Sequence, residues 1–426
     1  MKEMFFKLLV LLSFAGGKAS GQSPADTSFL SFSAAEKIFL EHNLSLLSAR
    51  YGIDANRALI RQARLWDNPL LATDQNLYDK QGGFLKHDQN NGQFYVQLTQ
   101  LIRTAGKRSK AAQLAMDNTI LSEQQLDDVL RSLRYTLRND LLEVNHLLKI
   151  KRVYDAEIAE VIKLSAGMDL LLEAGNVSVK DNLRIKALLF SLQNELVTVK
   201  SQLIPVEGEI RVLLNNNDNR FIRPELDYQF KQLTVFEAPP AEELIVKAVA
   251  NRPDARMAQT LVSLQTHNVI YQKALAKPDI SIGTEFDQHS SYAPDYVGLA
   301  IGLPLNIFNH NQGNISSAKF SLQQQKVLAD QSVLKIRQDI LSAVEKLKFF
   351  QHVNDPLQLE FSRKYDNLFF SMLKSYQDRQ LNLLDFIDFM DAYKDTKLKL
   401  LEQHNGLVKS VEELNYAVGE ELFKLN

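Results

Sequence analysis

The sequence predicts a mainly α-helical protein that also contributes β-strands to a membrane. Glycine and proline are scarce, with 17 and 11 residues among 426, and the runs 70–204 and 357–426 contain no proline. Four short segments alternate apolar residues with polar or small ones, which is the two-residue period of a strand. The two halves also repeat one order of elements, which indicates a tandem structural repeat.

Composition excludes several classes of protein. The chain has 49 Lys and Arg against 51 Asp and Glu and is 45% hydrophobic. Neither a disordered chain nor a strongly basic nucleic-acid binder is expected from these values, so no nucleic-acid partner is predicted. Cysteine is absent, which excludes a disulfide framework, a thiolate metal site, a thiol nucleophile and acylation of an N-terminal cysteine.

Residues 1–21 have the organisation of a secretory signal peptide. Lys2 and Lys7 flank an apolar run that ends at Phe14, and Ala19 and Gly21 supply the small residues before the cleavage site. That run is too short to cross a bilayer as a helix, and no later stretch reaches 18 continuous apolar residues. The chain is therefore expected to be exported and to contain no membrane helix.

A very long helix is predicted over 107–172. This stretch contains one glycine, Gly167, and is rich in Leu, Ala, Lys, Arg, Gln and Glu, which all favour helix. One helix of this length would extend roughly 100 Å at about 1.5 Å per residue. Helices this long are typical of a coiled coil or a helical barrel rather than a globular domain.

The tandem repeat sets the expected domain organisation. The first repeat, 22–214, is expected to contain a helix, two strands, the long helix and a return helix, with the strands near 70–78 and 93–101. A polar linker, 215–240, separates the repeats. The second repeat, 241–426, is expected to contain a helix, two strands, a long helix and a return helix, with the strands near 279–287 and 296–303 and the long helix from 313.

The strand segments place apolar side chains on one face only. In the segment 296–303 that face carries Val297, Leu299, Ile301 and Leu303. Strands of this length suit a tilted crossing of a bilayer, and the same pattern also fits half-buried hairpins of a soluble sheet. Membrane strands are favoured because long helices flank both hairpins and leave little else to cover them. Four strands cannot close a barrel, and lipid does not tolerate an open edge, so an oligomer is expected, with eight strands in a dimer or twelve in a trimer.

Three motifs resemble the TolC-type outer-membrane efflux family, and the resemblance extends over about 32–423. Pro304–Gly313 (PLNIFNHNQG) resembles the strand-to-helix turn of the family's heavy-metal (cobalt-zinc-cadmium) branch. Gln100–Arg108 (QLIRTAGKR) resembles the corresponding turn of the first repeat, and Asn251–Asp254 (NRPD) matches the start of a second-repeat helix. The strand-to-helix turns are therefore assigned to Gly106, Pro304 and Gly313, and both glycines are expected to have a positive φ.

The resemblance implies a homotrimer with a twelve-stranded barrel in the lipid of the outer membrane and a long α-helical tunnel in the periplasm. It implies an exit channel of a tripartite pump, with a periplasmic adaptor (membrane-fusion) protein and an inner-membrane resistance-nodulation-division transporter as partners. The turn motifs favour export of heavy-metal cations. An exit duct for drugs or secreted proteins, and a periplasmic coiled-coil scaffold that is not a channel, are the alternatives.

The same resemblance predicts where the adaptor docks and where the channel closes. The tips of the adaptor are expected to contact two turns, formed by Gly175, Asn176, Val177 and Ser178 and by Gln380, Leu381 and Asn382. The periplasmic gate is expected at Tyr376, Asp385 and Asp388, where two carboxylates three residues apart share one helical face. In a trimer these aspartates would form two rings that select cations. An ordinary exposed helix face is the alternative.

Two residues near the gate depart from the family pattern. Arg379 stands where many members have glycine, and Leu381 stands where some have a gate arginine. No closing salt bridge is predicted for this reason.

The sequence contains no recognisable catalytic or metal-binding motif. Its eight histidines include no pair four residues apart, and there is no HExxH, GxSxG, Walker A or GxGxxG segment. No enzymatic activity, no metal site and no cofactor are predicted.

Overall fold

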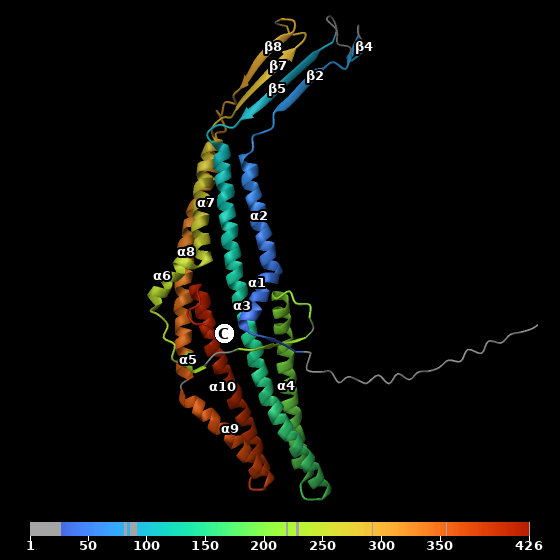
Figure 1. The fold of residues 1–426 in the computed structure, drawn as a ribbon, viewed down its shortest axis with the longest axis vertical. Helices are drawn as coiled ribbons and strands as arrows, with labels where there is room; N and C mark the ends of the chain where they lie inside the picture. The colour runs from blue at the N-terminus through green and yellow to red at the C-terminus, as the bar shows by residue number, and fades with distance from the viewer. Residues whose placement is uncertain are drawn as a thin grey trace, which may run out of the picture.

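The computed structural model describes residues 27–80, 83–85, 92–218, 220–226, 230–291, 293–354 and 356–425. The predicted signal peptide, 1–21, lies outside the described residues. The described chain is elongated, with a β-sheet at one end and two helical hairpins at the other (Figure 1). This arrangement confirms the predicted mainly helical fold with a small number of strands.

Four strands, two from each repeat, form one antiparallel sheet in the order β2-β5-β7-β8. They are β2 (Leu70–Gln75), β5 (Phe94–Ile102), β7 (Ile280–Asp287) and β8 (Tyr296–Gly302). β5 and β7 join the two repeats in the middle of the sheet, where Val96 is paired with Phe286. β2 and β8 are its two edges.

The first strand ends earlier than the predicted segment 70–78. The side-chain oxygen of Asn76 accepts a hydrogen bond from the Gln93 backbone amide at 2.7 Å, and the ladder stops at Gln75. Tyr78 belongs instead to β3 (Tyr78–Asp79), a short strand that pairs with β4 (Gly83–Phe84).

The sheet has one apolar and one polar face, because residues paired across strands point to the same side. On the polar face the Tyr95 hydroxyl donates to Glu285 at 3.0 Å, and the Gln93 amide donates to Asp287 at 2.8 Å. Glycine keeps this face free of steric clashes, since a Cβ added to Gly298 would lie 2.6 Å from the Tyr296 ring. The apolar face carries the following side chains, in chain order: Val96, Leu98, Ile282, Phe286, Val297, Leu299 and Ile301.

The helices next to the sheet follow the order of its strands. α2 (Leu44–Arg64) and α7 (Pro253–Leu275) lead into β2 and β7, whereas α3 (Lys107–Glu173) and α8 (Gln312–Val353) follow β5 and β8. α3 packs between α2 and α7, and α7 packs on α8. The order α2-α3-α7-α8 therefore continues the order of the sheet into the helical part (Figure 1).

At the far end the chain forms two antiparallel helical hairpins. α3 pairs with α4 (Val179–Leu213), and α9 (Pro356–Gln377) pairs with α10 (Leu383–Val418). α10 also packs on α3, which gives the order α4-α3-α10-α9 and places α4 and α9 on the outside (Figure 1). The two repeats thus pair along the whole molecule.

The second repeat does not have one long helix from 313, because the helix is broken between α8 and α9. Proline at 356 has no amide hydrogen and disfavours helical geometry in the residue before it. The buried Asn354 caps the end of α8, where its side-chain amide donates to the carbonyl oxygens of Phe350 at 2.7 Å and Gln403 at 3.1 Å.

The helix expected before each pair of strands is also divided in two. α1 (Phe32–His42) is separated from α2 by Asn43, whose side chain accepts from the Leu46 amide at 3.0 Å and donates to the Leu213 carbonyl at 2.8 Å. α6 (Ala241–Asn251) stops before Pro253, the first residue of α7. The tandem repeat extends to these paired helices.

The segment 215–240 contains regular structure and is not only a polar linker. β6 (Phe221–Pro224) pairs in parallel with β1 (Thr27–Leu30), and α5 (Phe230–Thr234) follows. Two fully buried residues, Ile222 and Leu233, hold this segment against the helices. Their burial explains why regular structure forms within a stretch of polar composition.

Candidate functional site at the hairpin turns

The two hairpin turns have the same backbone geometry. After the end of α3 at Glu173, Gly175 has φ 74°, and the Asn176 amide donates to the Leu171 carbonyl at 2.8 Å. After the end of α9 at Gln377, Arg379 has φ 59°, and the Gln380 amide donates to the Ser375 carbonyl at 2.8 Å. This left-handed residue followed by a six-to-one hydrogen bond is a Schellman motif. The turns are equivalent at an offset of 204 residues.

The helices that leave the turns are also capped in the same way. Ser178 accepts a hydrogen bond from the Asp181 amide at 3.1 Å and donates its hydroxyl to the Asp181 carboxylate at 2.7 Å. Asn382 accepts from the Asp385 amide at 3.0 Å and donates its side-chain amide to the Asp385 carboxylate at 2.6 Å. Each aspartate also lies where the helix dipole favours a negative charge. Asp385 therefore stabilises its own helix in this structure.

All the residues predicted to dock the adaptor lie at the end of the molecule opposite the sheet (Figure 1). Val177 and Leu381 occupy corresponding positions and pack partly against the apolar core. The exposed members of the two turns are Gly175, Asn176, Ser178, Gln380 and Asn382. Each turn thus has exposed polar residues at its tip and one apolar side chain, Val177 or Leu381, that packs partly against the core.

The three predicted gate residues lie close together but in different surroundings. The Tyr376 ring stacks on Phe386 with centroids 4.5 Å apart, and its hydroxyl lies 3.8 Å from the Met168 sulfur in α3. Burial, together with the Asp181 carboxylate, raises the pKa of Tyr376 above its ordinary value. Asp385 and Asp388 lie on the exposed face of α10, whereas Phe386 is buried. Tyr376 therefore joins the two hairpins, and the aspartates face outward from a single chain.

The strand-to-helix junctions are joined by polar contacts between the repeats. The ammonium of Lys107, which is only 4% exposed, donates to the Asp279 carboxylate and the Lys277 carbonyl, both at 2.7 Å. Lys107 follows Gly106, which has the expected positive φ of 65°. Sequence reasoning did not single out Lys107 or Asp279, although a lysine directly after a turn glycine and an aspartate directly after Pro278 were visible signals.

The second junction corrects the role expected of Gly313. Gly313 is the second residue of α8, and it is Asn311 that adopts the left-handed conformation, with φ 62°. The Asn311 side chain donates to the Gln272 carbonyl at 2.8 Å, which stabilises this conformation. Pro304 lies in the connection between β8 and α8 and is exposed.

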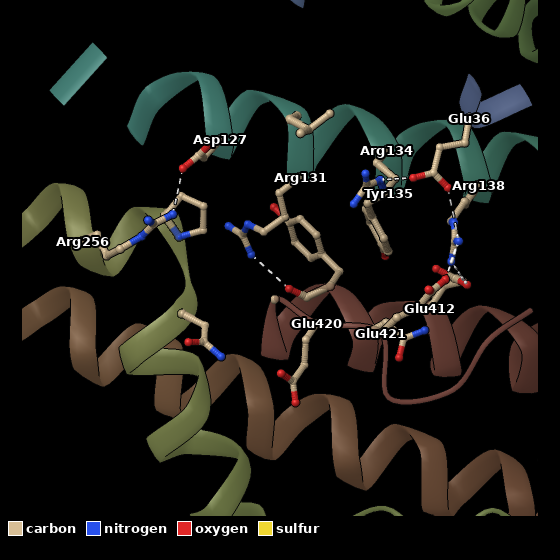
Figure 2. Close-up of a pocket in the computed structure, with 16 residues that line it drawn as sticks. Glu36, Asp127, Arg131, Arg134, Tyr135, Arg138, Arg256, Glu412, Glu420 and Glu421 are labelled. Atoms are coloured by element: carbon tan, nitrogen blue, oxygen red, sulfur yellow. Dashed lines mark hydrogen bonds and ion pairs between the residues drawn. The ribbon is translucent and has the colours of Figure 1, made fainter. Parts of the chain in front are cut away.

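A charged cluster near the middle of the molecule joins the repeats around a cavity of about 310 Å³ (Figure 2). Arg138 in α3 lies 3.6 Å from Glu36, 3.0 Å from Glu412 and 2.5 Å from Glu421. Burial raises the pKa of Glu412 to about 7, although Arg138 acts in the opposite direction. The lining arginines thus bind carboxylates of the same chain.

The Asn251–Asp254 motif lies beside this cluster. Arg252 is 3% exposed and donates to the Ala417 carbonyl at 2.9 Å, to Asp254 at 3.0 Å and to Asp339 at 3.1 Å. The motif therefore ties the start of α7 to α8 and to the end of α10.

None of the helices among the described residues has the length and apolar character needed to cross a membrane. No group of three or more His, Cys, Asp or Glu in the described ranges is arranged to hold a metal ion.

Comparison with known proteins finds a sequence family that the first repeat resembles. Residues 37–216 match the model of the family described as "Outer membrane efflux protein". This match agrees with the predicted resemblance over the part of the chain that contains the motif Gln100–Arg108. The family consists of efflux channels and not of enzymes, as predicted.

One curated relative and two solved structures extend the likeness to most of the chain. The cobalt-zinc-cadmium resistance protein CzcC of Cupriavidus metallidurans is 22% identical over 423 residues, covering 94% of this chain and 96% of CzcC. The Campylobacter jejuni CmeC outer membrane channel superposes with a TM-score of 0.73 at 14% identity, covering 92% of this chain and 87% of CmeC. The open state of the Neisseria gonorrhoeae MtrE outer membrane channel superposes with a TM-score of 0.69 at 17% identity, covering 92% of this chain and 89% of MtrE. The fold is that of these outer-membrane channels.

Proposed function

We propose that this protein is the outer-membrane exit channel of a tripartite efflux pump and that it works as a homotrimer. The observation that carries the proposal is a sheet with one apolar and one polar face, whose two edges are open and which continues into long helices. An open edge exposes unpaired amide and carbonyl groups, which lipid cannot satisfy. Pairing β8 of one copy with β2 of the next would remove every open edge.

The helices support the same contact between copies. α4 has four apolar residues spaced by seven, each between 58% and 71% exposed: Leu183, Phe190, Val197 and Ile204. α8, on the opposite side of the chain, has another such series, each between 66% and 73% exposed: Phe320, Val327 and Leu334. Apolar residues at heptad spacing are typical of helices that pack on another helix. Both sides of the single chain therefore need a partner.

Three copies would give twelve strands and a lumen lined by the polar face of the sheet. Eight strands, from two copies, leave an interior that side chains fill, whereas a wider barrel leaves a channel. The Tyr95–Glu285 and Gln93–Asp287 hydrogen bonds then line the lumen, and the apolar face meets the lipid of the outer membrane.

Isolation of the protein from cell envelopes tests this function. We expect it in the outer-membrane fraction, as a trimer that dissociates on heating, and we expect it to conduct ions in planar bilayers. A soluble periplasmic protein without conductance would contradict the proposal and favour the coiled-coil scaffold.

We further propose that an adaptor docks on the two hairpin turns and that the pump includes a resistance-nodulation-division transporter. Because the chain has no cysteine, Asn176→Cys and Gln380→Cys each introduce one reactive thiol on an exposed tip. We expect crosslinks from both positions to the adaptor in cells. Leu85→Cys, near the outer end of the sheet, is the control. Crosslinks from Leu85→Cys alone would reverse the proposed orientation.

Heavy-metal cations are the proposed cargo. The support is the likeness to CzcC over nearly the whole chain, together with the turn motif Pro304–Gly313. A strain that lacks the protein should become sensitive to cobalt, zinc and cadmium, and the intact gene should restore its tolerance. Sensitivity to drugs without sensitivity to these metals would contradict the metal cargo and leave the channel function standing.

A further inference from the structure

A buried carboxyl group without a partner lies where the two helical hairpins meet. Glu157 in α3 is 1% exposed, and neither of its carboxylate oxygens has a hydrogen-bond partner among the described residues. An unpaired carboxylate is costly to bury, so such a group usually binds a proton or moves toward an opposite charge.

The side chains around Glu157 come from three helices. Lys394 in α10 lies 3.1 Å from Glu195 in α4 and 3.5 Å from Asp391. The Tyr154 hydroxyl, one helical turn before Glu157, donates to Glu195 at 2.9 Å. Asp395 and Tyr393 of α10 also interact electrostatically with Glu157. Glu195 thus joins α3, α4 and α10 in one polar joint.

The charges of this joint do not balance if every acid is ionised. Among the described groups that act most strongly on Glu157, three are carboxylates, of Glu195, Asp391 and Asp395, and one is the Lys394 ammonium, which Glu195 and Asp391 already hold. Burial raises the pKa of Glu157 to about 8, and the three other carboxylates act in the same direction against Lys394. Glu157 is therefore a neutral acid at neutral pH.

We propose that Glu157 is a proton-binding site that controls the contact between the two helical hairpins. With its proton bound, the buried side chain lets α10 stay packed on α3 and joined to α4 through the Lys394–Glu195 ion pair. When the proton leaves, the carboxylate needs water or the Lys394 ammonium. Either change loosens the joint, since Lys394 is also the ion-pair partner that connects α10 to α4.

The joint lies on the same helices as the hairpin turns, so a movement at the joint can displace the turns. Glu157 lies 16 residues before Glu173, the end of α3, which corresponds to roughly 24 Å of helix at about 1.5 Å per residue. Between the joint and the turns, Tyr376 and Met168 also connect the hairpins. A separation at Glu157 would move the turns apart, and its effect on conductance rests on the proposed channel function.

The direction of the pH effect follows from proton linkage. The packed joint binds the proton more tightly than a hydrated joint, in which Glu157 has an ordinary pKa. The ratio of separated to packed molecules should rise by up to about tenfold per pH unit as the pH increases toward 8, and then level off.

Distances between the hairpin turns test this site independently of transport. Spin labels at Asn176→Cys and Gln380→Cys in the full-length protein report the separation of the hairpins by double electron–electron resonance. We expect the separated population to grow between pH 6 and pH 8. In the Glu157→Gln variant, which stays neutral at every pH, this growth should be reduced at least about threefold. Glu160→Gln, a change one turn away on the same helix, is the matched control and should behave as wild type.

Three outcomes would overturn the proposal. The first is equal pH dependence in the wild type and in Glu157→Gln, and the second is no pH dependence in the wild type. The third is a loss of the pH dependence in Glu160→Gln as well as in Glu157→Gln. A change of distance that depends on Glu157, in a protein that conducts no ions, would keep the proton site and contradict the channel function instead.

Discussion

Asp181 and Asp385 occupy the same position after the two hairpin turns, 204 residues apart, and each carboxylate accepts a hydrogen bond from the residue that caps its helix. Asp388 has no such counterpart, because the residue 204 positions before it is Arg184. The two aspartates predicted to form the gate therefore differ in their surroundings. Asp385 has a structural function shared by both repeats, and Asp388 is the negative charge particular to the second repeat.

The first prediction separates these two aspartates by mutation. Asp388→Ala should weaken the selectivity for cations in planar bilayers, because it removes three carboxylates from the mouth of a trimer. Asp385→Ala should also destabilise the start of α10, by about 0.5–1 kcal/mol, because it removes the carboxylate that accepts from the Asn382 side chain and interacts with the helix dipole. Asp181→Ala is the matched control, with a similar loss of stability. Reversal potentials across a salt gradient measure the selectivity, and an unchanged potential in Asp388→Ala would refute its role.

The second prediction concerns the two left-handed turn residues. Gly175→Ala should destabilise the first turn by about 1 kcal/mol, because a Cβ is unfavourable in this conformation. Exchange of the Asn176 amide hydrogen should then be about fivefold faster. Arg379→Gly should change the second turn less, since the strain it relieves is partly offset by the greater freedom of glycine in the unfolded chain. A larger change in amide exchange for Arg379→Gly than for Gly175→Ala would contradict this order.

The sequence predicts the repeated parts of this fold better than its exceptions. Two-residue alternation identifies the strands, because paired residues of β5, β7 and β8 place apolar side chains on one face of the sheet and polar ones on the other. It does not show where β2 ends, since that end depends on the side chain of Asn76. Arg379 adopts the geometry of Gly175 although an arginine gives no signal for a positive φ. At Arg379 the geometry of the hairpin turn outweighs the preference of arginine for a negative φ.

The sequence also hides which polar residues become buried. Glu157 lies between Ala156 and Ile158 in a helix rich in charges, where a solvated face is the natural expectation. Its burial depends on α4 and α10, which are distant in the sequence. Lys107 is hidden for the same reason, because its partner Asp279 is 172 residues away. Long-range packing, rather than local pattern, determines these sites.

The third prediction tests which face of the sheet meets lipid. Leu98 and Gln97 are neighbours in β5 and point to opposite faces. Leu98→Lys should reduce the amount of assembled trimer, because a lysine on the lipid face costs about 2–4 kcal/mol near the middle of a bilayer. Gln97→Lys places the same charge on the polar face, close to Glu285, and should assemble normally. Equal assembly of the two variants would contradict a membrane-spanning sheet.

The last prediction concerns stability against pH. Burial raises the pKa of Asp140 in α3 to about 7, with Glu209 acting in the same direction, and one carboxylate oxygen has no partner among the described residues. The stability that depends on its proton is complete below its ordinary pKa and is lost as the pH rises toward 7. Asp140→Asn, which stays neutral, should therefore stabilise the protein by about 1–3 kcal/mol at pH 7.5 and leave it unchanged at pH 4. Thermal unfolding at the two pH values measures the difference. Asp155→Asn, an exposed position on the same helix, is the control and should change neither value by more than about 0.5 kcal/mol. A stabilisation of equal size at both pH values would show that folding does not raise the pKa of Asp140.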